Sequence, residues 1–232
     1  MALVFGLVAV CSIGCGKRKP KGAENAAKSA AATAERAEAQ LADTHDAGVP
    51  NAAAASAEKS SSKASIRKPD GTVLYKVKLT SEKCKLYDAD DKLVGSVKIK
   101  GDKLKVNNAK DALVCSLKKK EYGYKAKDDK EKDLLKFKKE EGDYKIKDPA
   151  GKTLYKLKTK GYGYEINDGE GNMLAKAKAK GGWVHIEDKD GKALMSTEGL
   201  SSLASALMFI EKLPMLQRFG LATAARDFSH VH

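Results

Sequence analysis

Few side chains in this chain of 232 residues have the types and spacing that a catalytic or metal site requires. The four histidines are His45, His185, His230 and His232, and no cluster of other ligands accompanies them. Two histidines in a C-terminal tail do not make a metal site. We find no nucleophile with a base and an orienting acid at a defensible spacing. We therefore expect a protein that is not an enzyme, with no cofactor and no metal site.

An acidic or amide side chain recurs every 20 residues, and the segments 168–171 and 188–191 are faintly similar to calcium loops. Tight hairpin turns demand the same residues, because Asp and Asn bond the backbone just ahead and Gly adopts positive φ. We interpret the column as turn chemistry. Its members are Asp88, Asn108, Asp128, Asp148, Asp168 and Asp188.

These residues belong to a gapless repeat of 20 residues that runs seven times from about Ala64 to Glu198. Such a period determines how the whole fold must be interpreted. One of its apolar columns is Leu74, Val94, Val114, Leu134, Leu154, Leu174 and Leu194. Its lysine column is Lys78, Lys98, Lys118, Lys138, Lys158 and Lys178.

One repeat unit predicts a β-hairpin. Residues 144–147 alternate apolar and polar, 148–151 read Asp-Pro-Ala-Gly, and 155–160 alternate again. Alternation indicates a half-buried strand, and the Pro and Gly indicate a turn. Leu154 is out of step with Tyr155 and Leu157, which indicates a bulge or a strand start. Seven units then give up to about fourteen short strands in a meander.

The lysines alternate with apolar residues, so we expect them on the outer face of a sheet in a chain of net charge +13. One interpretation is solubility and protection of sheet edges. The other is attraction to an anionic surface. Both stay open, because acidic residues are interspersed.

The period changes after the last repeat. Residues 203–210 are apolar nearly all round, so a helix there must be buried, and Pro214 should kink or end it. The segment is too short to span a membrane, so we expect burial in protein. The expected residues of this central helix are Leu203, Leu207, Phe209, Ile210, Leu213, Leu216 and Phe219.

Strands and helix belong together on geometric grounds. About eight strands close into a barrel that side chains can fill, and more strands leave a void. A helix is about 10–12 Å across with its side chains and would fill that void. We predict a mainly β fold, an antiparallel meander of seven hairpin repeats closed into a 12–14-stranded barrel around a hydrophobic C-terminal helix. The alternatives are a β-solenoid and an open repeat sheet.

The hairpins, such as 148–158, together with residues 203–219 resemble the tubby-like barrel superfamily, which includes LURP-one-related proteins and phospholipid scramblases. The resemblance covers residues 65–219 and implies about twelve strands around a hydrophobic helix. It is one of pattern, and no phosphoinositide-binding residues match.

Residues 1–14 are uncharged and mostly apolar, which fits an export signal. Residues 12–15, Ser-Ile-Gly-Cys, resemble a bacterial lipobox, in which Cys15 is lipidated. Ser12 departs from the usual leucine, and no basic residue precedes the apolar run. In that family Gly16 after the cysteine implies the outer membrane. An ordinary cleaved signal or a buried strand is the alternative.

Four regions follow: a signal at 1–14, a partly helical or disordered Ala/Ser/Lys-rich tether at 15–63, the repeat domain at 64–199, and a C-terminal helix and tail at 200–232. Cys84 and Cys115 lie at inward positions, as two small buried hydrophobes or as a disulfide that export would permit.

The leading hypothesis is a non-enzymatic, lipid-anchored protein of the bacterial envelope that faces the periplasm. Its basic barrel face would meet anionic lipid, lipopolysaccharide or peptidoglycan. One alternative is lipid handling or scramblase-like activity inside the barrel, and another is a protein-interaction module that uses the C-terminal helix. We expect no nucleic-acid partner, because the tyrosines lie on the apolar face instead of forming an exposed stacking platform.

Overall fold

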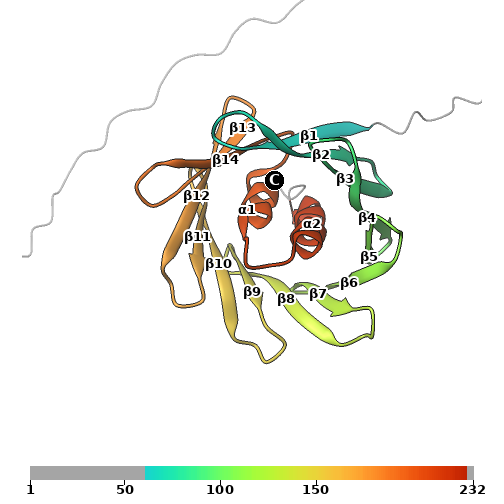
Figure 1. The fold of residues 1–232 in the computed structure, drawn as a ribbon. Helices are drawn as coiled ribbons and strands as arrows, with labels where there is room; N and C mark the ends of the chain where they lie inside the picture. Colours follow the sequence, from blue (N-terminus) through green and yellow to red (C-terminus); the bar gives the residue numbers. More distant parts are fainter. Residues whose placement is uncertain (1–60, 229–232) are drawn as a thin grey trace, which may run out of the picture. The chain divides into compact units, whose positions relative to one another are not determined.

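The structure is a computed structural model that describes residues 61–228. Each 20-residue unit forms two strands, and the fourteen strands follow one another as an antiparallel meander (Figure 1). The strands are β1 (Ser62–Arg67), β2 (Val73–Leu79), β3 (Lys83–Asp88), β4 (Leu93–Lys100), β5 (Lys103–Asn108), β6 (Leu113–Lys120), β7 (Gly123–Asp128), β8 (Asp133–Glu140), β9 (Asp143–Lys147), β10 (Thr153–Lys160), β11 (Gly163–Asp168), β12 (Met173–Lys180), β13 (Trp183–Glu187) and β14 (Ala193–Glu198).

The first and last strands pair with each other and close the sheet into a barrel. Ser65 lies opposite Glu198 and Ile66 lies opposite Thr197 in antiparallel register. This closure leaves neither strand as an unpaired edge. The predicted closed barrel is confirmed, and the open sheet and the solenoid are excluded.

The repeated column of acidic and amide side chains stabilises the hairpin turns, which confirms the interpretation of the sequence. The Asp88 Oδ1 atom accepts hydrogen bonds from the backbone N–H groups of Asp90, at 3.0 Å, and Lys92, at 2.9 Å. Asn108, Asp128, Asp168 and Asp188 make the same pair of bonds. These turns all lie at one end of the barrel.

The out-of-step apolar column consists of β-bulges. Val73 pairs with Arg67 and Tyr75 pairs with Ile66, so Leu74 between them has no partner residue. The same register shift recurs in every hairpin that carries the column. The column residues are half-buried, and most pack against the core. The bulge that Leu154 indicated is therefore a feature of all seven repeats.

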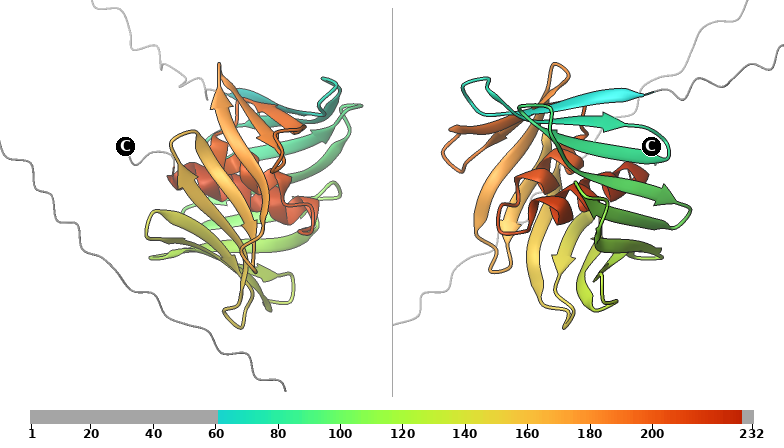
Figure 2. Two further views of the ribbon diagram at one scale, coloured as in Figure 1. Left: turned by 90° about the vertical axis from the view of Figure 1, so that its left-hand side faces the viewer. Right: turned by 45° about the vertical axis from the view of Figure 1, so that its right-hand side comes forward.

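Helices fill the space that the strands enclose (Figures 1 and 2). The apolar segment forms two helices instead of the single one expected, α1 (Ser202–Phe209) and α2 (Met215–Ala224), followed by the short 3-10 helix η1 (Ala225–Phe228). Ser201 caps α1, since its side chain accepts a bond from the N–H of Ala204. Pro214 stands immediately before α2, where its missing N–H has no cost. The chain therefore turns back after α1, and both helices lie inside the barrel.

The two helices and the barrel wall form one apolar core. Leu207 of α1, Leu221 of α2 and Phe137 of β8 are each at most 1% exposed. A Cβ atom at Gly220 would lie 2.7 Å from Cγ2 of Val106, so glycine allows α2 to approach β5 closely. Of the residues expected in a central helix, Ile210 and Leu213 lie in the connection between the helices. Leu203, Leu207, Ile210, Leu213 and Phe219 are buried, whereas Phe209 and Leu216 are half-buried.

Candidate functional site

The outer surface of the barrel from β2 to β7 is a continuous basic face. Because side chains alternate along a strand, the apolar residues that pack on the helices force their neighbours outward. Each of these six strands carries two outward lysines and no outward carboxylate within the strand. The basic face comprises Lys76, Lys78, Lys83, Lys85, Lys98, Lys100, Lys103, Lys105, Lys118, Lys120, Lys125 and Lys127.

Lysines of the basic face lie directly opposite one another on neighbouring strands. Lys98 pairs in register with Lys83 on one side and with Lys105 on the other. Lys118 is placed in the same way between Lys103 and Lys125. Like charges at directly opposed positions destabilise a sheet. The arrangement therefore costs stability, and an external anion would relieve that cost.

The carboxylates that reach the basic face come from its edges. Asp91 pairs with Lys76 and Asp111 pairs with Lys98, each at 2.8 Å, and both acids lie in hairpin turns. The hydrogen bond from Lys98 holds the pKa of the Asp111 carboxyl below its ordinary value. Within residues 61–228, several lysines of the face have no ion-pair partner: Lys78, Lys83, Lys85, Lys100, Lys103, Lys105 and Lys120.

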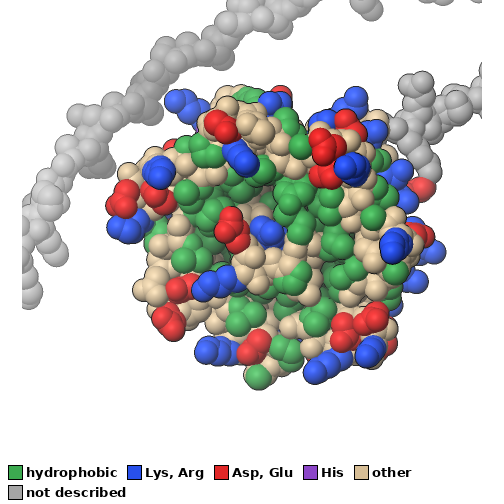
Figure 3. All heavy atoms as spheres, in the orientation of Figure 1, with side chains coloured by type: hydrophobic (Ala, Val, Ile, Leu, Met, Phe, Trp, Pro, Cys, Tyr) green, Lys and Arg blue, Asp and Glu red, His purple; other side chains and the backbone are tan. Residues whose placement is uncertain are grey.

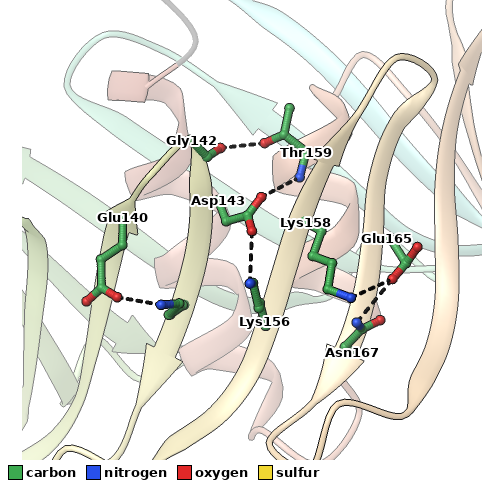
Figure 4. Close-up of polar contacts among 9 residues, drawn as sticks. Glu140, Gly142, Asp143, Lys156, Lys158, Thr159, Glu165 and Asn167 are labelled. Atoms are coloured by element: carbon green, nitrogen blue, oxygen red, sulfur yellow. Dashed lines mark hydrogen bonds and ion pairs between the residues drawn. The ribbon is translucent and has the colours of Figure 1, made fainter. Parts of the chain in front are cut away.

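The barrel wall from β8 to β13 is different, because carboxylates there stand among the lysines in the strands themselves (Figure 4). Glu140 binds Lys145 at 2.7 Å and Lys147 at 2.9 Å. Those hydrogen bonds lower the pKa of the Glu140 carboxyl to about 2. Asp143 binds Lys156 at 3.1 Å and Glu165 binds Lys158 at 3.3 Å. We call β8–β13 the mixed face, since its strands carry outward charges of both signs.

A groove of about 400 Å³ runs along the basic face over β5 to β7. Its floor includes Ser116, which points outward but is only 4% exposed and lies in register between Lys105 and Lys127 on the neighbouring strands. Lys103, Lys118, Lys120, Lys125 and Lys127 line the groove, with one carboxylate, Glu131. Ammonium groups around a polar floor provide donors for phosphate or carboxylate oxygens.

At the end of the barrel that Figure 3 presents, hydrophobic side chains gather over the enclosed space, with a few acidic and basic side chains among them and more around the rim. Within residues 61–228, no helix has the length and hydrophobicity needed to cross a membrane.

The lysine column predicted from sequence is divided between two environments. All six of its lysines point outward. Lys78, Lys98 and Lys118 belong to the basic face, whereas Lys138, Lys158 and Lys178 lie within 4 Å of Glu140, Glu165 and Glu187. Part of the signal that separates the two halves is present in the sequence, since among residues 61–228 outward acids stand within the strands only from Asp133 onward. The pairs that these acids form depend on the register between strands.

The other residues singled out in the sequence are dispersed. His185 lies on the outer side of β13, in register with Lys178 and Ser196. Cys84 and Cys115 are buried free thiols, so the two do not form a disulfide. No group of metal-ligating side chains is found among residues 61–228. Cys15, the signal, most of the tether, and His45, His230 and His232 lie outside the described residues.

No protein-family model matches the chain, and no curated protein matches it. A search of solved structures finds an X-ray structure of a protein from Arabidopsis thaliana, with 13% sequence identity and a TM-score of 0.33. The match covers 60% of this chain and 79% of the plant protein. A likeness of this size carries no argument about fold or function.

Proposed function

We propose that this protein is a non-enzymatic, lipid-anchored protein of the bacterial envelope whose basic face binds an anionic lipid surface. The observation that carries the proposal is the segregation of charge on the barrel wall. On the basic face, lysines lie opposite lysines and no strand carries an outward carboxylate. On the mixed face some lysines also lie opposite one another, as Lys138 and Lys145 do, but carboxylates within the strands bind them. Solubility alone gives no reason for such a division, whereas a patch of one sign strengthens attraction to phosphate-bearing headgroups.

The anchor in this proposal is a lipid on Cys15. Its support is the apolar, uncharged start of the chain and the Gly14-Cys15 pair, followed by basic residues at 17–21. A lipid anchor holds the domain at the membrane surface, where a polybasic patch adds electrostatic attraction to anionic lipids. Anchor and basic face would thus act together, at the outer membrane on its periplasmic side.

The two rival functions have less support. Lipid handling through an emptied barrel requires α1 and α2 to leave a space in which Leu207 and Leu221 are buried. A docking role for the C-terminal segment requires the same apolar residues to contact a partner. Both therefore require the core of the domain to open, and binding through the wall does not.

Sedimentation with vesicles tests the basic face. The full chain carrying Cys15→Ser is mixed with phosphatidylcholine vesicles with and without phosphatidylglycerol, so that no anchor contributes. We expect binding only to the anionic vesicles, and weaker binding at higher salt because surface charges are screened. The triple variant Lys78→Gln, Lys98→Gln, Lys118→Gln should lose most of the binding to anionic vesicles.

The control variant takes the other three lysines of the same column: Lys138→Gln, Lys158→Gln, Lys178→Gln. It removes the same charge from the mixed face and should bind nearly as the parent does. Equal losses of vesicle binding in the two variants would mean that binding depends only on net charge. That result would overturn the proposed role of the basic face. Sedimentation with isolated peptidoglycan and not with anionic vesicles would also contradict it.

A further inference from the structure

Besides the groove on the basic face, the protein has a cavity inside the barrel. This cavity is polar at one end and apolar at the other. It has a volume of about 230 Å³ and lies between α1, α2 and the strands β1 and β2. Ala204, Met208 and Phe219, each 3% exposed, line its inner part. Ser62 and Ser201 are exposed and mark the end where it opens.

Arg226 is the cationic side chain in the lining of this cavity. Its Nη1 atom donates to the backbone oxygen of Thr80 at 3.0 Å and lies 3.2 Å from the Cys84 sulfur. Among residues 61–228, no carboxylate lies within ion-pair distance of the guanidinium. A partly buried guanidinium normally pairs with a carboxylate or phosphate, which its planar donors match. Arg226 therefore retains donors for an anion.

The position of Arg226 is fixed by its neighbour. Asp227 binds Lys119 of β6 at 2.9 Å and accepts a hydrogen bond from the hydroxyl group of Tyr124 in β7. These contacts attach η1 to one side of the barrel. The Arg226 side chain extends toward another part of the wall, to Thr80, which follows β2, and to Cys84 in β3. The cation is thus held at the cavity by contacts with two separate parts of the barrel wall.

We infer that this cavity binds a single-chain amphiphile with an anionic headgroup, with the chain against Met208 and Phe219 and the headgroup at Arg226. The volume lies below the range of about 300–1,000 Å³ typical of drug-sized ligand pockets, so one short chain fits and a two-chain lipid does not. The site is separate from the basic face, and α1 and α2 stay in place.

Titration calorimetry with ligands of one chain length tests the inference. The full chain carrying Cys15→Ser is titrated with decanoate, decyl phosphate and decyltrimethylammonium, below their micelle concentrations. We expect saturable one-to-one binding of both anions and none of the cation. The ratio of the decanoate and decyl phosphate affinities tells whether a carboxylate or a phosphate headgroup is preferred. Binding of the cation as tightly as the anions would overturn the role of Arg226.

Three variants locate the binding. Arg226→Gln should weaken decanoate binding at least tenfold. Ala222→Leu and Ala204→Leu each place a larger side chain in the cavity from a different helix, and each should abolish binding. At least one of them should fold, since filling a cavity is often stabilising, and melting temperature identifies which. Unchanged decanoate affinity in a folded variant whose cavity is filled would overturn the proposed binding site.

The matched control is the triple variant Lys78→Gln, Lys98→Gln, Lys118→Gln of the basic face, which should bind decanoate as the parent does. Conversely, Ala222→Leu should still sediment with anionic vesicles. Loss of decanoate binding in the lysine variant would show that the anion binds the outer wall, and the cavity site would be rejected while the proposed function stood.

Discussion

The hydroxyl groups of Thr197 in β14 and Ser205 in α1 lie 2.6 Å apart in a fully buried contact. Ser205 also donates to the backbone oxygen of Ser201 at 2.8 Å, so Thr197 is the donor toward Ser205. The other repeats carry Val, Leu, Phe or Ala at the position of Thr197. The last strand is therefore joined to the first helix by a polar contact inside an apolar core.

This contact predicts unequal effects of its two single substitutions. Ser205→Ala leaves the Thr197 hydroxyl buried without a partner and should cost about 1–3 kcal/mol. Thr197→Val should cost less, because Ser205 keeps its bond to Ser201. Adding Thr197→Val to Ser205→Ala should recover stability. Urea unfolding of the four proteins measures this, and a double variant less stable than Ser205→Ala would contradict the assignment.

The helices inside the barrel should be essential to its stability. Leu207 is fully buried, so Leu207→Asp introduces an uncompensated charge that costs about 3–5 kcal/mol, a large part of a typical stability of about 5–15 kcal/mol. Lys105→Asp on the outer wall should change stability by no more than about 0.5 kcal/mol. Thermal melting followed by circular dichroism compares them. Similar melting temperatures for both variants would mean that α1 is not part of the core.

The ion pairs of Glu140 should make stability depend on pH. Its pKa is lowered to about 2 in the folded chain, below the value of about 4.3 for an unperturbed Glu. A lowered carboxyl pKa contributes stability that is complete above the unfolded pKa and is lost as pH falls through the folded one. Between about pH 4.5 and pH 2, Glu140→Gln should therefore lose less stability than the parent. Parallel pH curves would contradict the ion pairs.

One turn position tests backbone strain across the repeats. Glu131 has φ 60°, and the equivalent Gly151 has φ 97°. Left-handed backbone costs a residue with a Cβ about 1–2 kcal/mol, more than the exposed pair between Glu131 and Lys127 is worth. Glu131→Gly should raise the melting temperature and Gly151→Glu should lower it. Shifts of the same sign in both would refute this explanation.

The barrel could be predicted from the sequence because its signals are periodic, although only the pairing of β1 with β14 excludes the solenoid and the open sheet. The bulge at Leu154 and the turn at Asp148 are each repeated through the chain, so every unit supports the others. The path of residues 200–228 could not be read in the same way, since a segment that is apolar all round has no preferred face. Pro214 marked the break, but whether the chain kinks there or turns back depends on the width of the barrel.

The candidate site was predicted in part. Alternation placed Lys98 and Lys118 on the outer wall, but it did not show which strands lack carboxylates at facing positions, because register depends on pairing across strands. The cavity at Arg226 had no signal in the sequence. That residue reaches Thr80 and Cys84 only because the C-terminal segment passes back through the barrel.

The most direct measurement of the proposed anion-binding face is lysine acetylation of the full chain carrying Cys15→Ser, with and without phosphatidylglycerol vesicles, read residue by residue by mass spectrometry. Vesicles should protect lysines of the basic face several-fold, with Lys85, Lys103 and Lys105 among them. Lys136, Lys156 and Lys176 of the mixed face should react equally in both conditions. Protection that is uniform around the barrel, or strongest on the mixed face, would contradict it.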